Sequence, residues 1–332
     1  GAVDGEFELM CVVRHAVRRS PTPGPGAPPT AGPAVGRGSG SLDGLDVSDG
    51  LAAVAPALRS GLQQVGDSVV VVGGADHDAD DASGDLHGLW QVHVHTDHPL
   101  EALRVLGRWE AGPVVVRCLS HQVSAVSARA AGTSAPVGVV ACTASPGLMM
   151  DLARSGAVVV LRGDGEIERA DLLRAVHETD AGHVVVLPAD EQTLAVARGL
   201  ADLSYPQTTA VASTSDLHVV AALSAWVVGA VAPSDDLAAA LAPVVDAVGA
   251  VRAVRLDASR PTSVRDGIDG LLGSSASSPA QTVLTVLVGD LVPAQVVDDV
   301  VSRAEHLVPG VEVVVLPSGR RSTALVIGAE QQ

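Results

Sequence analysis

Two histidines separated by one residue, His93 and His95, are the side chains of this sequence best suited to chemistry. They lie in the stretch LWQVHVHTDHPLEAL, where valines alternate with them. Because successive side chains of a strand point to opposite faces, Val92 and Val94 share one face and the two imidazoles share the other. Two imidazoles on one face can hold a metal ion; the alternative is a strand whose polar face meets water.

The elements around this strand predict a ferredoxin-like sandwich, because their order is β-α-β-β-α-β. In chain order they are a strand at 6–13, a helix at 51–66, a strand at 68–74, the strand Leu89–Thr96, a helix at Pro99–Trp109 and a strand at 113–119. Residues 17–48 are rich in Pro and Gly without an apolar period, which predicts a loop. We expect this first domain to cover residues 1–122.

A second, α/β domain is expected over residues 136–332, after a linker at 123–135. Short runs rich in valine alternate with helical segments, a rhythm typical of a mostly parallel sheet that is buried on both faces. Two helices, Leu237–Val248 and Val264–Leu272, then follow in succession, and the end of the domain is expected to be antiparallel or mixed. The predicted strands lie at 136–143, 157–163, 183–190, 208–214, 282–289, 311–317 and 323–329.

Composition excludes several classes of function. The chain has 38 acidic residues against 21 basic ones, all of them Arg, and a net charge of -17, which argues against binding nucleic acid or an anionic membrane. No apolar run reaches the roughly 18 residues that span a bilayer, and the N-terminus is no signal peptide. The sequence therefore predicts a cytoplasmic protein without membrane insertion. Its three cysteines, Cys11, Cys118 and Cys142, form no CxxC pair, which favours reduced thiols.

Three segments of the first domain carry a resemblance to a known family. FELMCVV, QVGDSVVVVGG and LWQVHVHTDHPLEAL, in this order, resemble the middle domain of the fatty acid kinase A subunit family, whose members are dihydroxyacetone kinase-like proteins with a DhaL domain. PVGVVACTASPGLMMDLARSGAVVVLRG and HVVVLPADEQTLAVA resemble the C-terminal domain of that family, which has a DegV-like fold. The resemblance covers most of the chain.

The resemblance implies a zinc site and a kinase partner. Members of the family hold zinc in the middle domain through a cysteine and the two histidines of the HxHT strand. The position of that cysteine falls on Glu8 here, so the implied ligands are Glu8, His93 and His95. In the family a DhaL-like domain binds ATP and Mg²⁺ and phosphorylates a fatty acid held by a separate DegV-like protein. That domain has no recognisable counterpart in this sequence, which also lacks a P-loop and any Lys.

The second domain departs from the family at its loops. The family's GGQTMNPS is LRGDGEIER here, around Arg162–Glu168; its PNN is PAD at Pro188–Asp190; and its GGQP is SGRR at Ser318–Arg321. Such loops, at the carboxyl ends of strands, are where α/β sheets bind ligands. Asp164, Glu166 and Asp190 could form a carboxylate cluster for Mg²⁺, although acids of an acidic protein are usually solvated. No G-x-S-x-G motif supports a hydrolase triad.

Two hypotheses of different class follow. In the first, the chain is a non-catalytic module of a fatty acid kinase system in lipid metabolism, which docks a DegV-like fatty acid-binding protein for ATP-dependent phosphorylation by a DhaL-like domain outside this sequence. In the second, it is a free-standing zinc-dependent hydrolase-type enzyme that activates water at Glu8, His93 and His95. Such an enzyme also needs a general base and a substrate cleft, and the sequence identifies neither.

Overall fold

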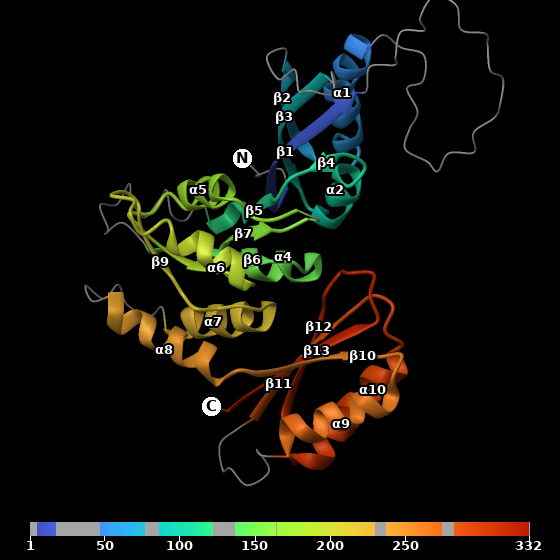
Figure 1. The fold of residues 1–332 in the computed structure, drawn as a ribbon, viewed down its shortest axis with the longest axis vertical. Helices are drawn as coiled ribbons and strands as arrows, with labels where there is room; N and C mark the ends of the chain where they lie inside the picture. The colour runs from blue at the N-terminus through green and yellow to red at the C-terminus, as the bar shows by residue number, and fades with distance from the viewer. Residues whose placement is uncertain are drawn as a thin grey trace, which may run out of the picture. The chain divides into compact units, whose positions relative to one another are not determined.

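The computed structural model describes residues 5–17, 47–76, 86–121, 137–163, 165–229, 237–273 and 282–331 (Figure 1). The chain divides into two compact units, Gly1–Val114 and Val115–Gln332. Apart from the ends of the loop, the predicted loop 17–48 and the predicted linker 123–135 lie outside the described residues.

Unit 1 is built on three strands that pair antiparallel in the order β2-β3-β1. Strand β3 (Leu86–Thr96) is central, with β1 (Phe7–Val17) on one side and β2 (Asp67–Asp76) on the other, while the short β4 (Glu110–Ala111) pairs with β1. Helices α1 (Val47–Leu62) and α2 (Pro99–Leu106) pack on these strands and on each other. Figure 1 shows both helices on the same side of the strands.

The alternation of β1 places every second side chain from Phe7 to Val13 in the core of unit 1. Phe7, Leu9, Cys11 and Val13 are all buried, and the last three lie opposite Val94, Val92 and Trp90 of β3. Buried Leu58 and Leu62 of α1 and Leu106 of α2 supply the core of the same unit. Cys11 is therefore a core residue, as its spacing from Phe7 and Leu9 indicates.

The first sheet of unit 2 has the order β5-β7-β6-β8-β9, and its pairs β6–β7, β6–β8 and β8–β9 are parallel. Its strands are β5 (Val114–Cys118), β6 (Val137–Thr143), β7 (Val158–Leu161), β8 (His183–Leu187) and β9 (Gln207–Ala210). The connecting segments are η1 (Pro146–Leu148), α4 (Met149–Arg154), α5 (Arg169–Glu178), α6 (Glu191–Arg198) and α7 (Asp216–Gly229).

The rest of unit 2 forms a separate four-stranded sheet of order β10-β13-β11-β12, in which only β11–β12 is parallel. Buried Leu284, Leu325 and Ile327 of this sheet pack with Ile268 and Val300 in one core. The elements are α8 (Leu237–Ala250), β10 (Arg252–Asp257), α9 (Pro261–Leu272), β11 (Thr282–Val288), α10 (Ala294–Leu307), β12 (Glu312–Pro317) and β13 (Ala324–Gln331).

The α/β class is confirmed, but the strands are mixed in direction rather than mostly parallel. The predicted parallel sheet corresponds to β6–β9, whereas the C-terminal strands build a second sheet. Strand β10 is absent from the prediction, which placed two helices in succession there. Its sequence RAVRLD lacks an apolar run because it lies at the edge of its sheet with most side chains exposed.

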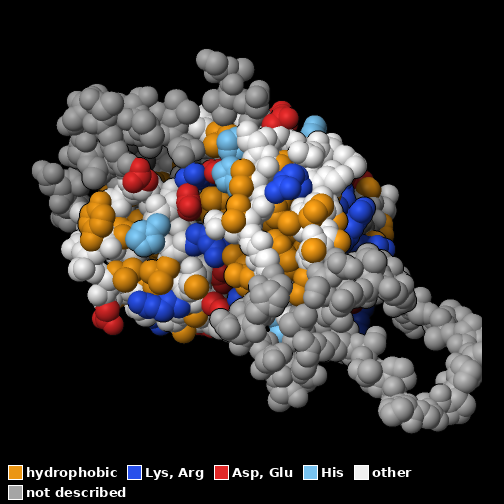
Figure 2. All heavy atoms as spheres, turned by 90° about the horizontal axis from the view of Figure 1, so that it is seen from above, with side chains coloured by type: hydrophobic (Ala, Val, Ile, Leu, Met, Phe, Trp, Pro, Cys, Tyr) orange, Lys and Arg blue, Asp and Glu red, His pale blue; other side chains and the backbone are white. Residues whose placement is uncertain are grey.

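The face of the molecule that Figure 2 shows carries side chains of both signs of charge. On the face that Figure 2 shows, blue and red side chains are interspersed among hydrophobic and uncharged ones instead of gathering by sign. All three cysteines are buried, and none of them forms a disulfide. Among the described helices, none has the length and apolar character that crossing a membrane requires.

A backbone contact joins the two sheets of unit 2. The amide N–H of Gly147, in η1, donates a hydrogen bond of 3.0 Å to the carbonyl oxygen of Ser318. A Cβ atom at Gly147 would lie 2.1 Å from the carbonyl oxygen of Pro317, and Gly319 adopts a left-handed backbone with φ +66°. This approach is possible only because Gly147 has no side chain.

We predict that Gly147→Ala destabilises the protein, because the added methyl group collides with backbone that cannot easily move. Gly270→Ala is the matched control: it lies in α9 with open space around its Cβ position, where alanine is favoured over glycine by about 0.5–1 kcal/mol. Urea denaturation should show a lower free energy of unfolding for Gly147→Ala and an unchanged or higher one for Gly270→Ala. Equal effects of both substitutions would contradict the contact.

Candidate metal centre

Glu8, His93 and His95 come together on one face of the unit 1 sheet. Nδ1 of His93 lies 3.1 Å from Oε1 of Glu8, and Nε2 of His95 lies 3.9 Å from the same oxygen. The Nε2 atoms of the two histidines are 3.0 Å apart, and their ring centroids are 4.9 Å apart. One ligand atom from each residue can be chosen so that all lie within 4.8 Å of one another.

The register of two strands produces this arrangement. Glu8 pairs directly with His95, and Met10 with His93, so the four side chains share the face that turns away from Leu9 and Cys11. On the other side of β3, strand β2 is irregular between Asp67 and Val70. Bulges of this kind bend a strand and re-aim its side chains.

The burial of Glu8 demands a partner for its charge. The Glu8 side chain is 4% exposed, whereas those of His93 and His95 are 30% and 23% exposed. A buried carboxylate without a partner is costly, so the nearby imidazole nitrogens stabilise it either as hydrogen-bond donors or as fellow ligands of a cation. The open side of the cluster is therefore the histidine side.

These three residues fit zinc in donor type and number. Zinc binds imidazole nitrogen and carboxylate oxygen at about 2.0–2.2 Å, and three protein ligands leave a fourth position for water. The donor atoms already lie close together in the observed strand register. The structure brings the three predicted ligands together; metal binding itself stays a prediction.

The residues after His95 fix the end of the strand. Oδ1 of Asp97 accepts a hydrogen bond of 2.7 Å from the backbone N–H of Glu6. The N-cap residue of α2 is His98, without a side-chain cap, and its N–H donates to the Thr96 hydroxyl. Asp97 directly precedes this N-cap residue but does not cap the helix, because its carboxylate is engaged with the residue before β1.

The predicted carboxylate cluster of unit 2 does not gather in the described residues. Asp164 lies outside them, and Glu166 is exposed. Asp190 caps α6, accepting hydrogen bonds from the N–H and hydroxyl of Thr193 at 2.7 and 3.0 Å, and pairs with Arg162 at 3.4 Å. Its oxygens are thus committed within the fold.

A polar network that the sequence did not indicate surrounds Asp216, at the start of α7. Its carboxylate accepts hydrogen bonds from the hydroxyls of Thr143 and Ser145, at 2.8 and 2.6 Å, and from the N–H of Ala144, at 3.2 Å. Burial, with the charges of Asp190 and Asp216, raises the pKa of the Cys142 thiol on β6. That thiol therefore stays protonated and unreactive.

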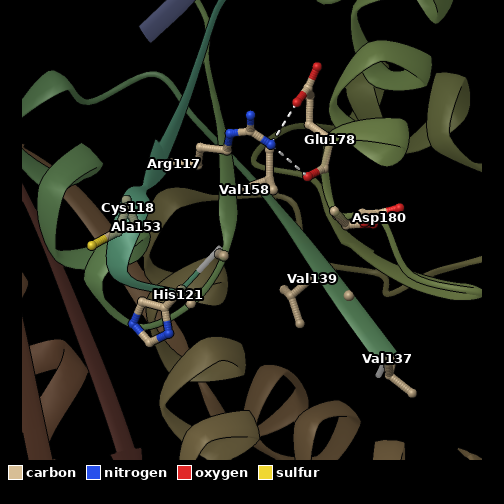
Figure 3. A pocket seen from close by; sticks show the side chains of 13 residues that line it. Arg117, Cys118, His121, Val137, Val139, Ala153, Val158, Glu178 and Asp180 are labelled. Atoms are coloured by element: carbon tan, nitrogen blue, oxygen red, sulfur yellow. Dashed lines mark hydrogen bonds and ion pairs between the residues drawn. The ribbon is translucent and has the colours of Figure 1, made fainter. Parts of the chain in front are cut away.

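A small hollow at the amino ends of β6 and β7 is held by internal pairs (Figure 3). It has a volume of about 210 Å³, and across it Arg117 forms an ion pair of 2.7 Å with Glu178. His121 lies 2.7 Å from the carbonyl oxygen of Arg154, to which its Nε2 donates. The polar side chains of Arg117 and His121 are thus bonded within the fold, so a ligand is not needed to explain their position in the hollow.

Together these features define a two-unit α/β protein with a histidine–carboxylate cluster on an antiparallel sheet. The sequence matches the middle domain of the FakA-like fatty acid kinase family over residues 46–115 and the C-terminal domain of the same family over residues 138–275. The chain therefore belongs to the FakA-like fatty acid kinase family and is a fatty acid kinase-related module. No curated protein matches the sequence.

The solved structures that match this chain have low sequence identity to it. A DegV family protein from Corynebacterium glutamicum is 12% identical with a TM-score of 0.47, the match covering 59% of this chain and 96% of that one. A fatty-acid-binding DegV family protein from Thermus thermophilus is 15% identical with a TM-score of 0.44, covering 59% and 99%. The dihydroxyacetone kinase of C. freundii is 7% identical with a TM-score of 0.49, covering 66% and 50%.

We predict that the protein, purified without a His tag, binds one zinc ion per chain and that His93→Ala/His95→Ala abolishes binding, because two of three ligands are lost. His98→Ala, which removes an exposed histidine of the same segment, is the control and should keep its zinc. Elemental analysis and calorimetry measure zinc binding by both variants.

Glu8→Cys should bind zinc more tightly than the wild-type protein, because a thiolate is a stronger zinc ligand than a carboxylate. A wild-type protein that takes up no zinc contradicts the site.

A pH prediction concerns His218, in the first turn of α7. Burial lowers its pKa, and its Nδ1 accepts a hydrogen bond of 3.1 Å from the N–H of Thr214. Below the ordinary pKa of about 6.5 the unfolded chain therefore binds a proton that the folded one resists, so stability is full above pH 6.5 and declines as the pH falls. His218→Asn keeps an acceptor without titrating, and should lose less stability between pH 7.5 and 5.0 in urea denaturation. The same pH dependence in wild type and variant would refute this assignment.

Proposed function

We propose that this chain is a non-catalytic docking module of a fatty acid kinase system. It binds a DegV-like protein that carries a fatty acid, and a DhaL-like kinase domain outside this sequence phosphorylates the acid with ATP and Mg²⁺. The match to the middle and C-terminal domains of the FakA-like family carries this proposal. The same proposal places the protein in the cytoplasm.

Docking has a physical benefit for such a reaction. A carrier held beside the kinase domain meets it at a high effective concentration, because the second encounter becomes intramolecular. The carrier must also leave after the transfer, so a transient interface suits the task. Such an interface buries on the order of 1,200 Å² or less and binds in the micromolar range.

Unit 2 offers a helix face for this contact. Val227 and Val228, at the end of α7, and Val245, on α8, are large apolar side chains that are at least half exposed. The two helices pack against each other. Exposed apolar side chains on helices that pack together are candidates for one protein-binding surface. We assign the carrier to this helix face, defined by Val227, Val228 and Val245.

Unit 1 has a supporting role in this proposal. Its β-α-β-β-α-β order forms a ferredoxin-like sandwich, and zinc at Glu8, His93 and His95 joins β1 to β3. Since these strands already pair along the length of β1, the ion adds to an existing contact. Such a metal is structural and holds the His-bearing face rigid.

The zinc-dependent hydrolase remains the second candidate, favoured by the open fourth position of the cluster. Zinc there lowers the pKa of a bound water and supplies a nucleophile. The two candidates differ in one observable. Hydrolysis of a simple activated ester that needs zinc, and that His95→Ala abolishes, supports the hydrolase; no zinc-dependent turnover supports the docking module.

We predict that the full chain binds a DegV-like fatty acid-binding protein in calorimetry and that Val228→Glu/Val245→Glu weakens binding at least tenfold, because two charges enter an apolar contact. The control is Leu291→Glu, which places a charge at another exposed apolar position of unit 2 and should leave binding unchanged. Circular dichroism verifies that all variants fold.

Two outcomes would contradict this assignment. Equal weakening by the control and the double variant would remove the helix face from the interface. The absence of binding by folded wild-type protein at high micromolar concentration would rule out the docking role.

A further inference from the structure

A cavity of about 390 Å³ lies in unit 2 where its two sheets meet. One wall is formed by the loops that follow β6 and β7, at the carboxyl ends of parallel strands, where α/β sheets bind ligands. The other wall is formed by the face of the four-stranded sheet and by residues 318–322. The hydrogen bond from Gly147 to Ser318 holds the two walls together. The cavity is thus built by elements far apart in sequence.

Its lining is strongly cationic in an otherwise acidic chain. Four arginines line it, Arg162, Arg255, Arg320 and Arg321, against one carboxylate, that of Asp216. Arg162 pairs with Asp190 at 3.4 Å, whereas the other three form no ion pair with any described residue. Like charges gathered around a concave space repel each other unless an anion neutralises them.

The strand register places one arginine toward the cavity with an apolar floor beside it. Arg255 of β10 lies opposite Val326 of β13, which lies opposite Leu287 of β11, so the three share one face of the sheet. The neighbouring residues on the other face, Leu256 and Leu325, belong to the buried core. Arg255 therefore faces the cavity because its neighbour Leu256 is needed in the core.

The polar groups around the arginines are ordered in advance. Asp216 is held by the hydroxyls of Thr143 and Ser145, which fixes the loop after β6. The hydroxyl of buried Ser318 accepts a hydrogen bond of 3.2 Å from the N–H of Arg320, so its own proton can be donated to a ligand. A fixed donor such as the Ser318 hydroxyl binds an anion with a smaller loss of conformational entropy than a mobile one.

We infer that this cavity binds the phosphate group of a small phosphomonoester. A phosphate monoester carries about -1.5 to -2 charges at pH 7, which matches several uncompensated arginines better than the single charge of a carboxylate. The guanidinium fork binds phosphate oxygens in a bidentate manner. Leu287 and Val326 contact the ester's carbon portion. This inference does not depend on the docking role.

The size of the cavity limits the ligand. Sites for small molecules occupy about 300–1,000 Å³, and this one lies near the lower end. The space suits a phosphate on a short carbon chain. The two loops that depart from the family at Arg162–Glu168 and Ser318–Arg321 both contribute arginines to it. The two loops whose sequences differ from those of the family thus supply part of the positive charge of the cavity.

The test uses calorimetry of the full chain with glycerol phosphate and inorganic phosphate at constant ionic strength. Wild-type protein should bind glycerol phosphate, and Arg255→Gln/Arg320→Gln should weaken binding at least tenfold. The control Arg198→Gln/Arg252→Gln removes the same charge from exposed positions outside the cavity and should bind like wild type. Thermal unfolding confirms that each variant folds.

Chemical modification localises the ligand without any substitution. Phenylglyoxal labels accessible arginines, and glycerol phosphate should protect Arg255, Arg320 and Arg321, but not Arg198, in peptide mass spectra. Equal affinities for both double variants, or unprotected cavity arginines at saturating ligand, would overturn the inference. Tighter binding of acetate or succinate than of either phosphate compound would also overturn it, since a carboxylate site would then be present.

Discussion

The pairing register of β1 with β3 is the constraint on which unit 1 depends. Strand side chains alternate with a period of two, so a shift by one residue would turn Glu8 toward the helices and Leu9 toward the histidines. The observed register, Glu8 opposite His95 and Leu9 opposite Val94, satisfies both faces at once. The core of Phe7, Leu9 and Cys11 therefore selects the same register that assembles the cluster of Glu8, His93 and His95. The packing of the core and the assembly of the cluster therefore both follow from one strand register.

In unit 2 the corresponding constraint is a close backbone contact at Gly147. The two sheets of unit 2 have separate cores, yet loops from both must meet to enclose a cavity. The missing side chain of Gly147 lets the backbone after β6 touch the backbone after β12. A cavity that depends on two sheets thus rests on a few backbone atoms, whereas the cluster of unit 1 rests on two long paired strands. The two candidate sites differ in how strongly the fold determines them.

Much of the local structure could be predicted from the sequence, because it depends on neighbours along the chain. The alternation in FELMCVV and in LWQVHVHT determines strands and faces, and the valine runs of β6–β8 determine buried strands. The union of Glu8 with the two histidines required the family resemblance, since periodicity alone does not tell which strands pair. The cationic cavity could not be predicted, because Arg255 lies on the edge strand β10, which lacks an apolar signal. Only the β10-β13-β11 register places Arg255 on the same face as Val326 and Leu287, beside the loop that carries Arg320.

The separation of β1 from β3 along the chain also bears on how the protein folds during synthesis. The bond between Glu6 and Asp97 joins residues 91 positions apart. Strand β1 leaves the ribosome before β3, so Phe7, Leu9 and Cys11 stay in contact with water until β3 has been synthesised. Because domains fold as units while the chain emerges, and non-local pairing is slow, the apolar side chains of β1 stay exposed until β3 has been synthesised, and a chaperone that covers β1 during this interval would prevent its aggregation.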